Sequence, residues 1–247
     1  MRIFRRVVLV HRALRYYGRI DPEEIHWMRS ILRPGDVAID VGAYKGGYTY
    51  WMRHSVGESG LVVCFEPQPS LAAYLRRCVR AFGWTNVGVE ELALSSTEGG
   101  GMLYVPNGKP SPGASLVGAS LPSGSQGYPV RTGTLDRALE SQPRNAPVRL
   151  IKCDVEGHEL DVFLGARQTL ETDRPFILFE CEARHLAKGC MADVFGHLQS
   201  LGYSGSFFWG RERIDVSAFD VDRHQVQGRR PYGNNFVFTP DEAPAPE

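Results

Sequence analysis

Segments of strand type and of helix type alternate along the chain after about residue 36, and this alternation constrains the fold more than any other feature. Short apolar runs predict strands, and amphipathic stretches between them predict helices. We expect strands at 36–41, 61–65, 87–90, 148–153, 175–180, 206–209 and 235–239, and helices at 47–54, 70–82, 159–170 and 192–201. Strands and helices in this order predict an α/β fold with a mostly parallel sheet, in which the last strand could lie antiparallel.

The length of 247 residues and the hydrophobic content of 43% fit one domain with a sizeable core. We expect that domain to cover residues 33–240, after an N-terminal helical segment at 1–32. The stretch 106–134 is rich in Gly, Pro and Ser and interrupts the alternation, so we expect a loop or hairpin insertion over one end of the sheet. The polar, arginine-rich connection 210–233 is expected near the substrate side, and the tail 241–247 is expected to be disordered.

Charge and cysteine content narrow the classes of function. The chain has 28 basic and 28 acidic side chains, so no global field favours nucleic acid. Its five cysteines have no CxxC spacing, and we interpret them as reduced core thiols of a cytoplasmic protein. No apolar run approaches the roughly 20 residues that a membrane-spanning helix requires. The oligomeric state stays open.

Six arginines surround apolar residues in the first 20 positions, which predicts a basic amphipathic helix. One interpretation is a helix packed on the domain with a solvated arginine face. The other is a lid, or a peripheral contact with a membrane surface. The sequence does not separate the two.

The first strand ends in a glycine-rich turn, Asp40-Val-Gly42-Ala-Tyr-Lys-Gly46-Gly47. Glycines there let backbone amides approach a ligand at the carboxyl edge of a parallel sheet, where open α/β folds bind nucleotides. The spacing matches neither common pyrophosphate pattern. S-adenosylmethionine (SAM) carries no phosphate, and Asp40 could attract its positive charge.

A second acidic residue supports a nucleoside ligand. The second strand ends in Phe65-Glu66-Pro67, about 20 residues beyond the glycine turn. A carboxylate at this position can accept both ribose hydroxyls. We therefore interpret Glu66 as the ribose anchor.

These residues resemble the FkbM family of SAM-dependent methyltransferases, and the resemblance runs from about Arg33 to Pro240. It is carried by 40–46 (DVGAYKG), 65–67 (FEP), 93–95 (ALS), 134–136 (TLD), 151–159 (IKCDVEGHE), 175–180 (PFILFE) and 235–240 (NFVFTP). It implies a class I methyltransferase (Rossmann-like) three-layer sandwich, whose sheet has seven strands with the last antiparallel. The cofactor-binding residues that we expect from the resemblance and from the same segments are Asp40, Gly42, Ala43, Tyr44, Gly46, Thr49, Glu66, Pro67, Glu91, Leu92, Ala93 and Asp154.

The acceptor hydroxyl must lose its proton as the new bond forms, so a catalytic base is expected. The candidates lie near strand ends that converge beside the glycine turn: Asp154 first, His158 second, then Glu156 and Glu180. His158 departs from the small residue more usual in the family. These carboxylates could instead hold a divalent cation, but no His-rich or Cys-rich spacing supports a metal site.

Together these features predict a SAM-dependent O-methyltransferase that acts on a small-molecule or glycan acceptor, namely a sugar, a glycolipid or a polyketide-type secondary metabolite. A catalytically silent SAM-binding scaffold is one alternative. A nicotinamide-dependent oxidoreductase is another, although it predicts a pyrophosphate-binding glycine pattern that the chain lacks.

Overall fold

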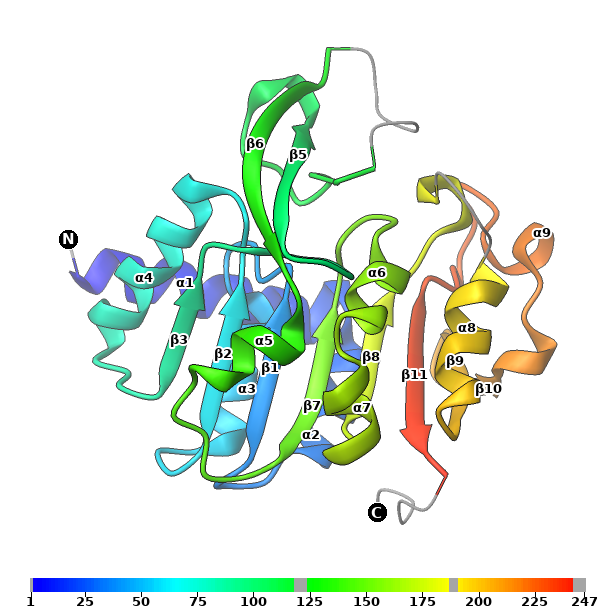
Figure 1. Ribbon diagram of the computed structural model, residues 1–247, viewed down its shortest axis with the longest axis horizontal. Coiled ribbons are helices and arrows are strands. Elements are labelled where there is room, and N and C mark those ends of the chain that lie inside the picture. The colour runs from blue at the N-terminus through cyan, green and yellow to red at the C-terminus, as the bar shows by residue number, and fades with distance from the viewer. Residues whose placement is uncertain (1, 118–123, 187–190, 242–247) are drawn as a thin grey trace.

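The computed structural model describes residues 2–117, 124–186 and 191–241, and Figure 1 shows their arrangement. The predicted tail falls almost wholly outside these ranges, as does Cys190. The other four cysteines are free and buried, as expected of core thiols.

A central sheet of eight strands runs in the order β10-β9-β11-β8-β7-β1-β2-β3. Five adjacent strands run parallel to one another: β1 (Val37–Val41), β2 (Leu61–Phe65), β3 (Val87–Glu90), β7 (Val148–Cys153) and β8 (Phe176–Glu180). The last strand, β11 (Asn235–Pro240), lies antiparallel between β8 and β9 (Tyr203–Trp209). The predicted α/β class with an antiparallel last strand is confirmed. The eighth strand, β10 (Glu212–Asp215), lies at one edge of the sheet. It comes from the 210–233 connection, which also contains α9 (Val221–His224).

Helices cover both faces of this sheet, which makes three layers (Figure 1). One apolar core holds buried side chains of α2 (Pro22–Ile31), α3 (Gly47–Val56) and α4 (Pro69–Phe82). The second core holds those of α5 (Leu135–Glu140), α6 (Glu159–Leu164), α7 (Arg167–Thr172) and α8 (Met191–Ser200). Strands such as β1 are buried on both sides, as the near-continuous apolar runs predicted.

The single helix expected at 159–170 is two helices, α6 and α7, and Gly165 lies at the break. A Cβ atom at Gly165 would lie 2.1 Å from the backbone oxygen of Ser95. The carbonyl of Gly165 accepts the backbone N–H of Asp136 at 3.1 Å. Asp136 in turn accepts the N–H groups of Gln168 and Thr169 at the start of α7. Tertiary contacts thus divide a stretch that has helical periodicity throughout.

The predicted insertion is a β-hairpin that rises from the edge at which the parallel strands end (Figure 1). Its strands are β5 (Gly99–Val105) and β6 (Gln126–Gly133), and β6 also pairs with β4 (Ala93–Leu94). The hairpin begins seven residues before position 106, where we placed its start. Because β5 begins with three glycines, its side-chain pattern does not predict a strand.

The N-terminal segment forms α1 (Arg2–Arg15) and a π-helical turn, Tyr16–Ile20. Leu9 and Ala13 are buried, and the indole N–H of Trp51 in α3 donates to the carbonyl of Ala13 at 2.8 Å. The helix is therefore packed on the domain. Among the described helices, none combines the length and the apolar character needed to cross a bilayer.

Candidate active site

The turn after β1 can be built only with glycine at position 42. Gly42 has φ of 73°, and a Cβ atom there would lie 1.9 Å from the backbone oxygen of Asp154. The backbone N–H of Asp154 donates to the carbonyl of Val41 at 3.1 Å. The ends of β1 and β7 are thus held against each other, which brings the glycine turn and Asp154 into one site.

Asp40 has one carboxylate oxygen without a partner. Its Oδ2 accepts the hydroxyl of Thr49 at 2.6 Å, whereas Oδ1 is buried and has no hydrogen bond from the described residues. Lys152 is its neighbour in register on β7. Burial raises the pKa of Asp40, while Lys152 and Thr49 act in the opposite direction. A buried acceptor without a partner among the described residues is a place where a water, an ion or a ligand is expected.

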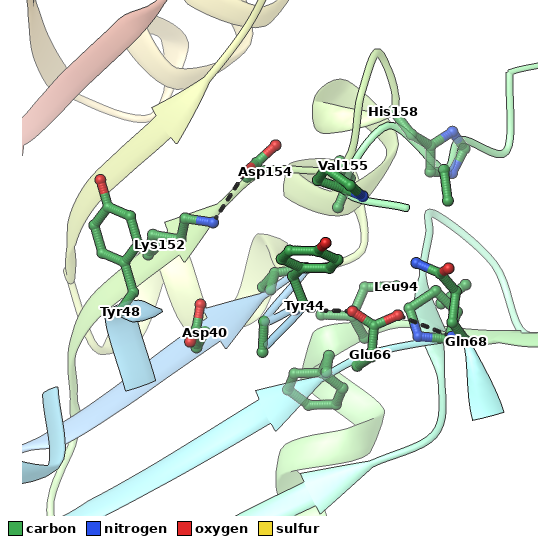
Figure 2. Close-up of a pocket in the computed structure, with 18 of the residues that line it drawn as sticks. Asp40, Tyr44, Tyr48, Glu66, Gln68, Leu94, Lys152, Asp154, Val155 and His158 are labelled. Carbon is green, nitrogen blue, oxygen red and sulfur yellow. Dashed lines mark hydrogen bonds and ion pairs between the residues drawn. The ribbon is translucent and has the colours of Figure 1, made fainter. Parts of the chain in front are cut away.

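Glu66 braces the glycine turn from the end of β2. Its Oε2 accepts the backbone N–H of Tyr44 at 2.8 Å, and its Oε1 accepts the backbone N–H of Gln68 at 2.9 Å (Figure 2). The side chain is buried, and this burial raises its pKa to about 7, although the two N–H groups favour the charged form. Each oxygen keeps a lone pair for a further donor.

A pocket of about 820 Å³, including its open mouth, lies at the carboxyl edge of the sheet. Figure 2 shows Asp40, Glu66, Lys152, Asp154 and His158 around it. Its apolar walls include Ala43, Phe65, Leu92, Ala93, Leu94, Leu103, Pro112, Ala114, Leu116 and Val155. The few polar groups converge on a mostly apolar space, as in cofactor sites.

The hairpin insertion closes one side of the pocket. The side-chain amide of Gln68 donates to the carbonyl of Ser111 at 2.9 Å and accepts the N–H of Ser111 at 3.0 Å. The hydroxyl of Ser115 donates to the carbonyl of Glu156 at 2.6 Å. The hairpin is therefore held to the segment after β2 and to the segment after β7. We expected an insertion near this edge, but the sequence did not identify Gln68 or Ser111.

The N-terminal segment supplies a further wall through Tyr16. Its ring lies so close to Gly47 that a Cβ atom there would come within 2.8 Å of it. It also contacts Tyr48 edge to face, with ring centroids 5.8 Å apart. The sequence did not identify Tyr16 as part of the site.

Lys152 and Asp154 form an ion pair on the pocket wall, with Nζ 3.3 Å from Oδ2. Burial disfavours the charge of Lys152, but the carboxylates of Asp154 and Asp40 more than offset it and raise its pKa above the ordinary value. Lys152 therefore stays protonated. The second oxygen of Asp154 has no protein donor among the described residues.

His158 is the other candidate base that lines the pocket. Its Nε2 lies 3.0 Å from the hydroxyl of Ser95, and its Nδ1 lies 3.5 Å from Asp161. Burial lowers the pKa of His158, and Asp161 counters only part of this effect. The imidazole is consequently neutral near neutral pH and can accept a proton.

Glu156 and Glu180 do not line this pocket. Glu156 pairs with His185 at 2.6 Å, and Glu180 accepts the side-chain amide of Asn234 at 2.7 Å. Burial raises the pKa of Glu180 well above its usual range, and the charges of Asp154 and Glu156 add to the effect. The structure thus brings Asp154 and His158 to the site and leaves these two beside it.

Comparison with known families identifies the family of the chain. The sequence matches the model of the methyltransferase FkbM domain over residues 40–204. The chain belongs to the FkbM family of methyltransferases. It is a SAM-dependent methyltransferase, and the resemblance found in the sequence is confirmed. No protein of curated function matches closely enough to count as a relative.

Solved structures confirm the class I methyltransferase fold. The methyltransferase FkbM from Methylobacillus flagellatus KT is 15% identical, with a TM-score of 0.52 over 95% of this chain. This chain spans only 54% of that protein. A Clostridium thermocellum protein, provisionally named an rRNA methylase, is 10% identical, with a TM-score of 0.51 over 90% of this chain and 96% of its own.

The FkbM-family pocket fits SAM on its own geometry. The unpartnered Oδ1 of Asp40 suits a cationic group, and the lone pairs of Glu66 suit ribose hydroxyls. The backbone approach at Gly42 leaves no space for a side chain. The described residues hold no group of three or more His, Cys, Asp or Glu side chains that could bind a metal ion.

Most of the cofactor-binding residues expected from the sequence line this pocket: Asp40, Gly42, Ala43, Tyr44, Glu66, Pro67, Leu92, Ala93 and Asp154. Three do not. Thr49 donates its hydroxyl hydrogen to the carboxylate of Asp40. Gly46 precedes α3 and lies against the side chain of Leu9. Glu91 lies at the surface, where it pairs with Arg76 at 3.1 Å. In the described residues, the 210–233 connection contributes nothing to this pocket.

Proposed function

We propose that this FkbM-family enzyme transfers the methyl group of SAM to a hydroxyl oxygen of a sugar, a glycolipid or a polyketide-type metabolite. The observation that carries the proposal is the placement of two proton acceptors, Asp154 and His158, on the wall of one pocket with Asp40 and Glu66. Bound SAM supplies a methyl group activated by a sulfonium. An aliphatic hydroxyl needs a base as well, because its proton must leave as the C–O bond forms.

Asp154 is the better placed of the two bases. Lys152 holds one of its oxygens, which leaves the other to accept the proton of the hydroxyl. The fixed ammonium also orients the carboxylate, so less freedom is lost when the acceptor binds. The neutral imidazole of His158 can accept the proton instead, or hydrogen-bond a second hydroxyl of the acceptor.

The hairpin and Tyr16 limit the access of water. Leu103, Pro112, Ala114 and Leu116 form an apolar cover on one side of the pocket, and Tyr16 lies on another. Exclusion of water strengthens the hydrogen bonds to the carboxylates and prevents hydrolysis of the donor.

The four buried, free cysteines support a reducing compartment, and we propose the cytoplasm.

The test is transfer of a labelled methyl group from SAM to a panel of monosaccharides, a glycolipid, a macrolide and amine-bearing compounds of similar size. We expect a product whose label survives alkali, since a methyl ether is stable to base and a methyl ester is not. Label found only in esters or on amine nitrogen would overturn O-methylation of a hydroxyl. SAM binding without transfer to any class would favour the silent scaffold.

A further inference from the structure

The outward face of α1 is apolar. Ile3, Phe4, Val7 and Leu14 are exposed by 77%, 71%, 60% and 53%. Their spacing of three, four and seven residues puts them on one side of the helix. A run of large exposed apolar side chains on one helix marks an interaction surface, whereas single ones do not.

Arginines border this face. Residues 1–20 contain six arginines and no Asp or Glu. Because the whole chain carries 28 basic and 28 acidic side chains, the remaining 227 residues carry six more acids than bases. Arg6, Arg15 and Arg19 are exposed, and no carboxylate in the described part of the chain lies within ion-pair distance of them. Positive charge is thus concentrated where the apolar side chains are exposed.

The opposite face of α1 is fixed to the active site. The side chain of Leu9 packs against Gly46, and the guanidinium of Arg12 donates to the carbonyl of Lys45 at 3.3 Å. The turn that follows places Tyr16 in the pocket. The helix is therefore held in place before any partner binds, and its free face has a defined direction relative to the pocket.

We propose that α1 docks this protein on the surface of a membrane that contains anionic lipids. The exposed apolar side chains insert between the lipids, and the arginines contact acidic headgroups. A short helix with an apolar stripe and bordering basic residues has the pattern of a helix that lies in the plane of the interface. A second copy of this chain is a poorer occupant, because it would bring its own arginine cluster against this one.

Docking would place the pocket, through Tyr16 and the glycine turn, next to the lipid surface. The inference does not rest on the identity of the methyl acceptor. Its test measures lipid binding alone, so failure of one proposal leaves the other standing.

The experiment is cosedimentation of the full chain with vesicles of phosphatidylcholine alone and of phosphatidylcholine mixed with phosphatidylglycerol. We expect binding to the mixed vesicles that decreases as salt is raised, and little binding to the neutral ones. Arg15→Gln and Arg19→Gln should each weaken the partition about fivefold. Phe4→Ser should weaken it about tenfold through lost apolar burial.

Leu164→Ser and Arg229→Gln are matched controls, since both side chains are exposed elsewhere on the protein. They should bind vesicles as the parent chain does. Equal binding to both vesicle types, no binding to either, or equal effects of the control and α1 substitutions would overturn the proposal. A dimer in lipid-free solution that Phe4→Ser converts to monomer would overturn it in favour of a second copy.

Discussion

The carboxylate of Glu66 accepts the backbone N–H of Tyr44 at 2.8 Å, across 22 residues of chain. This contact ties the end of β2 to the glycine turn after β1. Glu66 thereby shapes the turn and presents its remaining lone pairs to the pocket. The binding role that we expect of Glu66 and its structural role would come from the same two oxygen atoms.

Glu66→Ala should weaken SAM binding about 10-fold to 100-fold, because hydrogen bonds to a charged group contribute about 1.5–3 kcal/mol. It should also lower the free energy of unfolding, since the N–H groups of Tyr44 and Gln68 lose their acceptor. Isothermal titration with SAM measures the first effect, and denaturant unfolding without SAM the second. Unchanged affinity for SAM would show that the ribose binds elsewhere.

Affinity for SAM should rise with pH between about 5.5 and 8 and then level off. Burial raises the pKa of Glu66 to about 7, so at lower pH its carboxyl is protonated and accepts fewer hydrogen bonds. The change cannot exceed about tenfold per pH unit for this one group. Asp40, whose pKa is also raised, acts in the same direction. Titrations across this range should show the trend, and Glu66→Gln should flatten it.

Without SAM, the free energy of unfolding should decrease as pH rises, whereas the affinity for SAM should increase. Burial raises the pKa of Glu66, Glu24 and Glu159 to about 7 from 4.5, so the folded state binds more protons than the unfolded state between these values. The free energy of unfolding should therefore decrease as pH rises from about 4.5 to 7. Denaturant unfolding at several pH values tests this sign, and a rise over that interval would contradict it.

Asp154→Asn should lower the rate of methyl transfer about 100-fold or more, the usual contribution of a positioned base. The amide keeps the shape of the side chain but cannot take up the proton. Single-turnover rates at saturating SAM separate this effect from cofactor affinity. Glu156→Gln is the matched comparison, because Glu156 pairs with His185 outside the pocket. A larger loss from Glu156→Gln would place the base there.

Gly42→Ala and Gly83→Ala form a pair that separates backbone strain from steric conflict. The two glycines have φ of 73° and 72°, but nothing lies within 4 Å of a Cβ atom at Gly83. Gly83→Ala should cost about 1 kcal/mol of unfolding free energy from its left-handed conformation. Gly42→Ala should cost several times more and abolish SAM binding, because its methyl group meets the backbone of Asp154. If thermal unfolding shows that the two variants lose equal stability, the expected steric conflict at Gly42 is absent.

The class of fold and the main acids of the site could be predicted from local pattern. The alternation of apolar strands and amphipathic helices predicted the parallel sheet, and Asp40, Glu66 and Asp154 were found because they lie at the carboxyl ends of strands. Parallel strands end at one edge, so residues at their ends meet whatever the details of packing. Gly165 shows where this reasoning ends, since the break between α6 and α7 depends on a distant carbonyl.

The walls of the pocket depend on tertiary contacts, which the sequence pattern does not predict. Tyr16, Gln68 and Ser111 carry no pattern that indicates a ligand, and they meet there because an N-terminal helix and a hairpin fold over the same edge. Glu91 shows the converse, because its place in the chain suggested the pocket and its ion pair with Arg76 turns it to the surface. The sequence by itself determined the sheet and the acids at its edge, because periodicity and strand order act locally. Only the tertiary structure decided what encloses them, because contacts across the chain depend on the packing of segments that have no common pattern.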